Sequence, residues 1–244
     1  MSLFAVSGLS VDMMRDGLTS RIVDHVGFDL DEGSIVDLAG VSGCGKSTLL
    51  RACALMLPHS EGALALRGRP HTDFEPARWR ACVCLIPQKA SLVPGSVRDN
   101  LLLPWKLAVR KNSPMPSDAD LRHSMDEALL DDVPLNREAN RLSGGQAARV
   151  ALLRAFLTGP DVLLMDEVDA ALDSESSAAV SRITQAAANR GTACLRIRHR
   201  GPDGLASRTL RMADGRLSES AATAGKPGSA GSAVSQGQQE ALHG

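Results

Sequence analysis

The stretch AGVSGCGKST, residues 39–48, places glycines, a lysine and hydroxyl side chains directly after an apolar segment. The spacing of Gly40 and Gly45-Lys46-Ser47 matches the phosphate-binding pattern G-x-x-x-x-G-K-[ST]. Glycines permit conformations in which several N–H groups point at one anion; the lysine adds positive charge and the serine hydroxyl suits magnesium. We therefore predict a nucleotide site here rather than a simple glycine-rich turn. The residues expected to contact the nucleotide are Gly40, Ser42, Gly43, Cys44, Gly45, Lys46, Ser47 and Thr48.

Two carboxylates close the apolar run DVLLMDE at 161–167. A strand of this type would deliver Asp166 and Glu167 to its carboxyl end, where ligands bind in parallel α/β sheets. Asp166 would then hold magnesium together with Ser47, and Glu167 would orient or deprotonate the attacking water. The alternative reading, two exposed acids that end a strand, is disfavoured by the phosphate-binding pattern upstream.

The segment LSGGQ at 142–146 precedes a helical pattern that ends near Gly159-Pro160. Taken alone, this segment could be a flexible turn. At a helix N-terminus, its serine and glycine N–H groups would form a second anion-binding surface. One chain has little use for two such surfaces on one triphosphate, so the second would serve the nucleotide of another protomer.

Strand and helix patterns alternate along most of the chain. Apolar runs predict strands at 3–11, 21–30, 34–39, 62–70, 81–88, 161–167 and 192–199. Helical patterns occupy 97–132, with a loop at 112–117, and also 144–159 and 174–191. This order predicts an α/β fold built on a mostly parallel sheet. Residues 221–244, rich in Ala, Gly, Ser and Gln, are predicted to be a disordered tail after a single domain at 1–220.

Composition narrows the functional classes. The 244 residues carry a net charge of −1, which does not indicate a polyanion-binding protein. No apolar run reaches the roughly 18 residues of a membrane-spanning helix, and the N-terminus lacks a cleavable leader pattern, so we expect a cytoplasmic chain. The five cysteines are scattered without metal-ligand spacing. We expect them to be small, mostly buried side chains in a reducing compartment.

The phosphate loop, LSGGQ and DVLLMDE, in this order and spacing, resemble the ATPase subunit of an ATP-binding cassette (ABC) transporter over residues 3–217. The resemblance implies a P-loop NTPase cassette with an N-terminal antiparallel β subdomain and a helical subdomain at about residues 89–158. It also implies that two chains close head to tail around two ATP molecules and Mg²⁺. Ser143, Gly144, Gly145 and Gln146 would then face the γ-phosphate held by the partner.

Three further positions acquire roles only through this resemblance. Gln88, in LIPQ, matches a glutamine that contacts magnesium and couples to the membrane subunit. Asp173, in AALD, matches a loop that crosses the dimer interface. His199, in RIRHR, matches a histidine that touches the γ-phosphate. Without the resemblance, Gln88 and His199 would be read as surface residues.

The chain also departs from the family pattern. The segment VDMMRDGLTSR at 11–21 lacks the usual adenine-stacking aromatic, so Val11, Met13 or Met14 is expected to pack on the base. DEVDAALD replaces the commoner Asp-Glu-Pro-Thr form but keeps both acids. Arg196 and Arg198 stand where the family is mostly apolar, and alternation could put both on one face. We expect them to lie at a solvated strand edge rather than to bind nucleic acid.

The segment SVRDNLLLPWKL at 96–107 resembles the short Fet-type ATPases associated with iron or metal export. Its Trp105 is either a packing anchor or a contact for a membrane subunit. The expected function is ATP hydrolysis that powers a separate membrane-spanning permease, with the chain peripheral on the cytoplasmic side of the membrane. An importer of another small solute is the alternative within the family.

Other classes of protein with a phosphate loop fit the sequence less well. A DNA-repair ATPase would need a long coiled-coil insertion that residues 89–141 cannot hold. A duplicated translation factor needs two cassettes, and a small P-loop kinase has no use for LSGGQ. We therefore expect no nucleic-acid partner.

Overall fold

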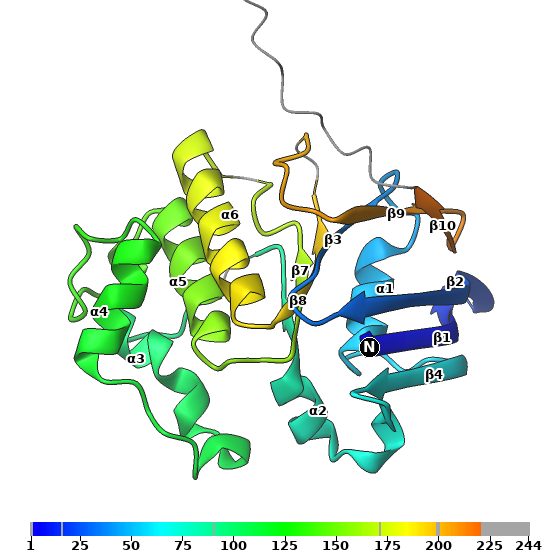
Figure 1. Cartoon of the computed structure of the whole chain (residues 1–244), viewed down its shortest axis with the longest axis horizontal. Coiled ribbons are helices and arrows are strands. Elements are labelled where there is room, and N and C mark those ends of the chain that lie inside the picture. The colour runs from blue at the N-terminus through cyan, green and yellow to red at the C-terminus, as the bar shows by residue number, and fades with distance from the viewer. Residues whose placement is uncertain (1, 16, 90, 171, 199–200, 221–244) are drawn as a thin grey trace, which may run out of the picture.

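The chain forms two β-sheets in the computed structural model, one antiparallel and one mostly parallel (Figure 1). The structure describes residues 2–15, 17–89, 91–170, 172–198 and 201–220. The antiparallel sheet has the strand order β2-β1-β4-β5. Its strands are β1 (Ser2–Arg15), β2 (Leu18–Asp31), β4 (Glu61–Leu66) and β5 (Arg69–Pro70). The expected N-terminal antiparallel subdomain is therefore present.

The second sheet has the strand order β10-β9-β3-β8-β7-β6. Its strands are β3 (Ile35–Ala39), β6 (Val83–Ile86), β7 (Val162–Asp166), β8 (Ala193–Ile197), β9 (Arg208–Ala213) and β10 (Arg216–Ser220). The strands from β9 to β6 run parallel, whereas β10 pairs antiparallel with β9. Every residue of β7 and β8 is buried, as expected for strands covered on both faces. The prediction of a mostly parallel core is confirmed.

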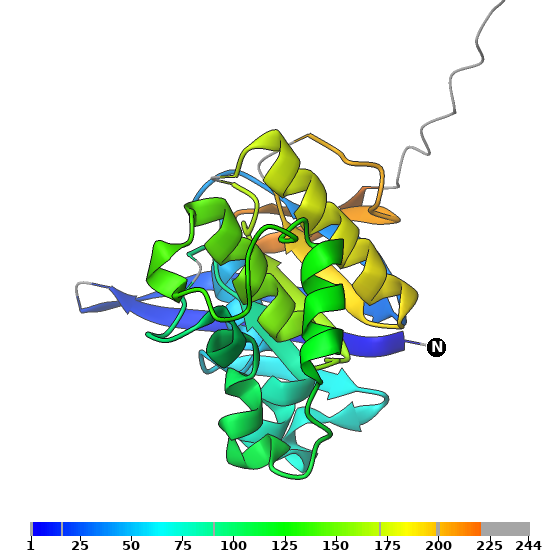
Figure 2. The same cartoon turned by 90° about the vertical axis from the view of Figure 1, so that its left-hand side faces the viewer.

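Helices lie on both sides of the parallel sheet, and most of them gather at one end of the molecule (Figure 1). Seen from that end, the helices lie in front of the sheets (Figure 2). They are α1 (Lys46–Cys53), α2 (Pro76–Cys82), α3 (Val97–Leu101), α4 (Asp118–Glu127), α5 (Gly144–Phe156) and α6 (Ser174–Asn189). Single 3₁₀ turns lie at His71–Asp73, Leu103–Lys106, Ala108–Arg110 and Ala139–Arg141. Ser96, Ser117 and Ser143 begin α3, α4 and α5 with capping boxes, which satisfy N–H groups that a helix start leaves free.

Two hydrophobic cores hold these layers together. One core joins the antiparallel sheet to α1 and one face of the parallel sheet, and it contains Phe4, Leu49 and Trp79. The other packs α3 to α6 on the opposite face, and it contains Leu121 and Ile183. The α/β fold with separate antiparallel and helical parts is thus as expected, while the domain boundaries at 1–220 and 89–158 remain predictions.

Some local predictions were wrong. Residues 81 and 82 belong to α2, so the strand predicted at 81–88 is confined to β6. The run 97–132 is not one interrupted helix, because α3 ends before a 3₁₀ turn that contains Pro104 in its first turn. The hairpin of β9 and β10 was not predicted at all. Asp214 and Gly215 at its turn both have positive φ, so this Asp-Gly pair was an available hairpin signal.

The cysteines and Trp105 behave as structural side chains. All five cysteines are free thiols; Cys53, Cys82 and Cys194 are buried. Trp105 is partly buried against the helical core, and its indole N–H donates to the Pro114 carbonyl at 2.8 Å, which favours the packing role. Within the described ranges, no helix has the length and apolar character needed to cross a membrane.

Candidate functional site

The phosphate-loop pattern forms the turn between β3 and α1. Gly45 caps α1 in the left-handed region, at φ 106°, and a Cβ there would lie 2.7 Å from the Ile22 carbonyl oxygen. A Cβ on Gly40 would lie 2.3 Å from the Met212 carbonyl oxygen. Any larger residue at either position would therefore push the loop away from β2 or β9. The glycines let the backbone form a tight cradle at the N-terminus of α1, the geometry that binds phosphate.

Lys46 is folded over this cradle. Its side chain is buried, and Nζ donates to the carbonyl oxygens of Gly40 at 2.8 Å and Val41 at 2.9 Å. These two bonds hold the ammonium group at the loop, beside the N–H groups of the α1 N-terminus. A triphosphate would meet a positive charge that is already oriented.

Ser47 and Asp166 bring two oxygen ligands together from distant parts of the sequence. Ser47 Oγ donates to Asp166 Oδ1 at 2.8 Å, and Asp166 is buried at the carboxyl end of β7. A hydroxyl and a carboxylate are the hard oxygen donors that Mg²⁺ prefers. These two side chains therefore fit a magnesium ion held next to the phosphate cradle.

Glu167 and Gln88 meet beside the same cradle. Gln88 Nε2 donates to Glu167 Oε2 at 2.7 Å, joining the loops that follow β6 and β7. Glu167 has φ 52°, a conformation that a non-glycine residue adopts only when the surroundings determine it. Its main-chain N–H donates to the Ile197 carbonyl at 3.2 Å, at the end of β8. The carboxylate is thus placed at the point where the phosphate loop and the strand ends converge.

A cavity of about 350 Å³ lies over this group of residues. It is lined by Met13, Met14, Ile22, Ser42, Gly43, Gly45, Lys46, Ser47, Thr48 and Glu167. Cys44 does not line it among the described residues, because that side chain packs against the core. One end is therefore polar and lined by the phosphate loop, and the other end is apolar.

The apolar end agrees in part with the expectation for adenine packing. Met13 and Met14 are 41% and 80% exposed at the cavity, whereas Val11 is 1% exposed within the core, so Val11 was a wrong candidate. Ile22 was missed. It lies on β2 and lines the cavity next to the two methionines, and the pairing of Met13 with Ser20 shows that β1 and β2 run side by side here.

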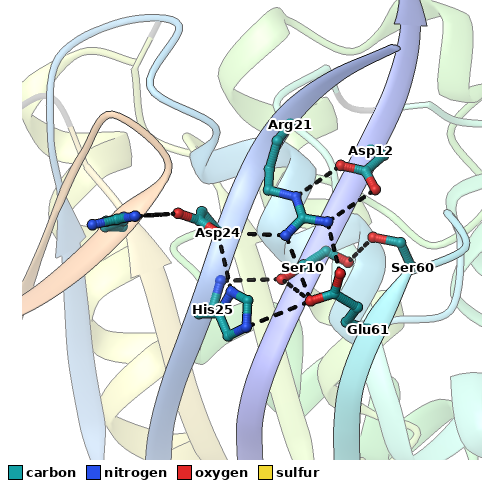
Figure 3. Close-up of polar contacts among 8 residues, drawn as sticks. Ser10, Asp12, Arg21, Asp24, His25, Ser60 and Glu61 are labelled. Atoms are coloured by element: carbon teal, nitrogen blue, oxygen red, sulfur yellow. Dashed lines mark hydrogen bonds and ion pairs between the residues drawn. The ribbon is translucent and has the colours of Figure 1, made fainter.

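A network of surface ion pairs links the strands that carry this apolar end (Figure 3). Arg21 on β2 donates to Asp12 on β1 at 3.0 Å and to Glu61 on β4 at 2.8 Å. Asp24 forms an ion pair with Arg216 on β10 at 2.7 Å. These pairs are exposed, so water and salt screen them and they contribute little to stability. They connect β1, β2, β4 and β10 across the surface.

The LSGGQ segment lies away from this cavity. Ser143 is the N-cap of α5, and its hydroxyl accepts from the Gln146 N–H at 3.2 Å. Ser143 and Gly144 are exposed, and none of residues 143–146 is among the described residues that line the cavity. Figure 1 shows α5 in the helical part of the molecule and α1 beside the antiparallel sheet. The N-terminus of α5 therefore faces away from the cavity, with Ser143 and Gly144 exposed.

Asp173 adjoins the LSGGQ segment. It caps α6 by accepting from the Ser176 N–H at 2.7 Å, and that bond lowers the pKa of its carboxyl group. A Cβ on Gly145 would lie 2.7 Å from Ser176 Oγ and 4.0 Å from Asp173 Oδ2. The N-termini of α5 and α6 are therefore neighbours, and glycine at 145 allows their close approach.

His199 lies outside the described residues, so its predicted role is untested by the geometry. The expectation for the two arginines before it was wrong in part. They do share one face, but β8 lies between β3 and β7, so it is not an edge. Arg196 is 3% exposed and forms ion pairs with Asp37 and Asp203. Carboxylates on neighbouring elements, which the local pattern could not show, neutralise these buried charges.

A phosphate cradle at a helix N-terminus, with oxygen ligands at the ends of parallel strands, defines a P-loop nucleotide-binding protein. Residues 23–170, more than half of the chain, match the family model described as ABC transporter. The chain belongs to this family and carries its ATP-binding domain.

Individual relatives include both export and import proteins. The chain is 32% identical over 157 residues to the probable iron export ATP-binding protein FetA of Escherichia coli, covering 64% of this chain and 68% of that protein. It is 42% identical over 165 residues to the taurine import ATP-binding protein TauB of Rhizobium johnstonii, covering 66% of this chain and 58% of that protein. The chain is also 32% identical, over 70% of its length, to the ABC-type transporter kk1G of Curvularia clavata. It spans only 13% of the length of that protein.

A solved structure supports the fold. A dimeric ATP-binding cassette in a post-hydrolysis state, bound to ADP and Pi, matches with a TM-score of 0.77 and 21% identity. The match covers 89% of this chain and 98% of that one. The cassette fold is therefore shared.

Proposed function

We propose that this chain binds MgATP, hydrolyses it between two copies of itself, and thereby powers a separate membrane-spanning subunit. The observation that carries the proposal is that Lys46, Ser47 and Glu167 line one cavity. Asp166 is bonded to Ser47 there, and Gln88 is bonded to Glu167. The loop and Lys46 would bind the phosphates, and Ser47 and Asp166 would hold Mg²⁺, which neutralises phosphate charge. Glu167 would orient the attacking water and accept its proton.

Phosphate release from ATP by the purified chain tests this proposal. We expect turnover that requires Mg²⁺ and disappears with excess chelator. In Lys46→Ala, turnover should fall with the loss of nucleotide affinity, because the oriented charge at the cradle is removed. Hydrolysis that persists in Lys46→Ala would show that the activity comes from elsewhere.

The apolar end of the cavity predicts weak discrimination between purines. Met13, Met14 and Ile22 can bury a base but cannot stack on it, and an aromatic platform contributes roughly 1–3 kcal/mol per base. We expect similar affinities for ATP and GTP, and tighter ATP binding in Met13→Tyr or Met14→Tyr. Titration of the purified chain with ATP, GTP and inorganic triphosphate measures how much the base contributes to the affinity. Met56→Tyr is the matched control, because Met56 is exposed away from the cavity. Strong selectivity of the unmodified chain for ATP would contradict the prediction.

A second cavity supports the proposal of a membrane partner. It has a volume of about 530 Å³ and a mostly apolar lining that includes Leu107 and Gln88, so it reaches the glutamine that contacts Glu167. Arg110 and Arg154 also line it. Within the described ranges, both guanidinium groups donate to carbonyl oxygens and neither forms an ion pair. Burial lowers the pKa of both guanidinium groups. An apolar segment that carries an acidic side chain would fit this groove.

Charge reversal in the groove tests the proposed docking. Arg154→Glu should reduce the fraction of the chain retained on washed membranes that contain the permease, while hydrolysis in solution stays near normal. Arg182→Glu is the matched control, because Arg182 is exposed on α6, outside the groove. Equal retention of both variants would argue against docking here.

The transported solute is the finer part of the proposal. We propose metal export, supported by the SVRDNLLLPWKL segment and by the similarity to FetA. Import of a small solute is the second candidate, because TauB has the higher identity. Iron accumulation in cells that lack the chain would favour export, and a selective defect in taurine use with normal iron content would favour import.

A further inference from the structure

A buried network of ion pairs joins β8 to the segments on either side of it. Arg196 donates through Nε to Asp37 on β3 at 2.8 Å, and through Nη1 to Asp203 at 3.0 Å. Asp203 also accepts from Ser181 on α6 at 3.0 Å. Burial acts to raise the pKa of Asp203, but Arg196 outweighs it and lowers that pKa to about 2. Both members of the Arg196–Asp203 pair are therefore charged inside the fold.

Arg198 extends the network toward the proposed catalytic loop. Its Nε donates to Asp169 Oδ2 at 3.1 Å, and its Nη1 lies 2.8 Å from Asp203 Oδ2. The side chains of Arg198 and Asp169 are only 9% and 5% exposed. Asp169 lies two residues after Glu167. This ion pair therefore joins the turn that follows β7 to Arg198, the residue that follows β8.

This pair is placed to fix the backbone of Glu167. The Glu167 N–H already donates to the Ile197 carbonyl, and the Glu167 carbonyl accepts from the Ala170 N–H at 3.1 Å. The contact of Asp169 with Arg198 adds a second attachment within the same turn, to the residue that follows β8. Since Glu167 has a positive φ, its conformation depends on such attachments.

Stability alone is a poor explanation for the pair. A buried ion pair usually contributes no more than well-packed apolar side chains of similar volume, because both charges lose their hydration. Asp169 Oδ1 is buried and has no hydrogen-bond partner within the described ranges, which adds to that cost. Both residues also belong to departures from the family pattern noted above: Asp169 to DEVDAALD, and Arg198 to the pair of arginines in RIRHR. The structure places these departures in direct contact.

We infer that Arg198 and Asp169 are a pair of positioning residues for hydrolysis, which hold the turn at residues 167–170 against the end of β8. The inference rests on the proposed function. Neither side chain lines the nucleotide cavity among the described residues, so the pair acts through Glu167. Loss of either partner would loosen the carboxylate and leave the phosphate cradle intact.

Steady-state kinetics of Asp169→Asn, Arg198→Gln and the double variant test the pair. We expect each single variant to lower kcat roughly tenfold, which is less than the roughly hundredfold cost of a 1 Å misplacement of a catalytic group. The Kd for MgATP should stay within about twofold, and the double variant should lose no more than either single variant. Arg198→Lys, which keeps the charge, should recover part of kcat and covers the case in which Arg198→Gln does not fold.

Asp37→Asn is the matched control, because it removes a partner of Arg196 that has no contact with Asp169. It should lower Tm without a selective loss of kcat. The inference would be overturned if Asp169→Asn and Arg198→Gln lost no more kcat than Asp37→Asn does. It would also be overturned if the losses of the two single variants added up in the double variant. Absence of hydrolysis in the unmodified chain would overturn the proposed function itself, whereas normal hydrolysis in every variant would overturn only the positioning role.

Discussion

Glu167→Gln is expected to lower kcat for ATP hydrolysis by at least about a hundredfold while MgATP binding persists. The substitution keeps the size of the side chain and its capacity for hydrogen bonds, including one with Gln88. It removes the negative charge that would accept a proton from water. The phosphate cradle, Lys46 and the Ser47–Asp166 pair are unchanged, so ground-state affinity should change little.

Single-turnover kinetics and nucleotide titration on the same preparation separate binding from chemistry. Glu175→Gln is the matched control, because Glu175 is an exposed acid in the first turn of α6, outside the cavity. It should retain normal turnover. Near-normal turnover in Glu167→Gln would remove this carboxylate from the proposed catalytic role.

Ser143→Arg is expected to abolish an ATP-dependent dimer that Glu167→Gln otherwise accumulates. Ser143 and Gly144 are exposed at the N-terminus of α5 and do not line this chain's own cavity. In a composite site they would face the partner's γ-phosphate, where an arginine would replace a small donor surface. Binding of MgATP by one chain should survive, because the cradle at α1 is untouched.

Light scattering with and without MgATP measures this difference. The Glu167→Gln single variant should double in mass with MgATP. The double variant that also carries Ser143→Arg should remain a monomer. Ser117→Arg is the control, since Ser117 is another exposed capping-box serine, at the start of α4. A dimer that forms despite Ser143→Arg would place the interface elsewhere.

The parts of the site that local sequence determines were predictable. The phosphate loop depends on backbone conformations that only its glycines allow, and DVLLMDE had to be a buried strand that ends in acids. The structure accordingly brings Ser47 and Asp166 within 2.8 Å, although 119 positions separate them. The Gln88 assignment needed the family resemblance, because nothing local marks an exposed glutamine as a partner of Glu167.

The wrong predictions about the site share one physical cause, which is contact between distant segments. Arg196 seemed to require solvent, but Asp37 on β3 and Asp203 after β8 neutralise it inside the fold. Val11 seemed available to a base, but the antiparallel pairing of β1 turns it into the core. Ile22 became part of the cavity only because β2 pairs alongside β1. Such outcomes depend on strand pairing, which a local pattern does not specify.

The dependence of specific activity on chain concentration tests the central claim most directly. If each catalytic site combines the phosphate loop of one chain with the LSGGQ segment of another, hydrolysis per chain must rise with chain concentration and level off as the dimer saturates. We predict this rise for the chain in MgATP, and its loss in Ser143→Arg. A specific activity that stays constant from dilute to concentrated solution, with the chain monomeric throughout, would contradict a site shared between two copies.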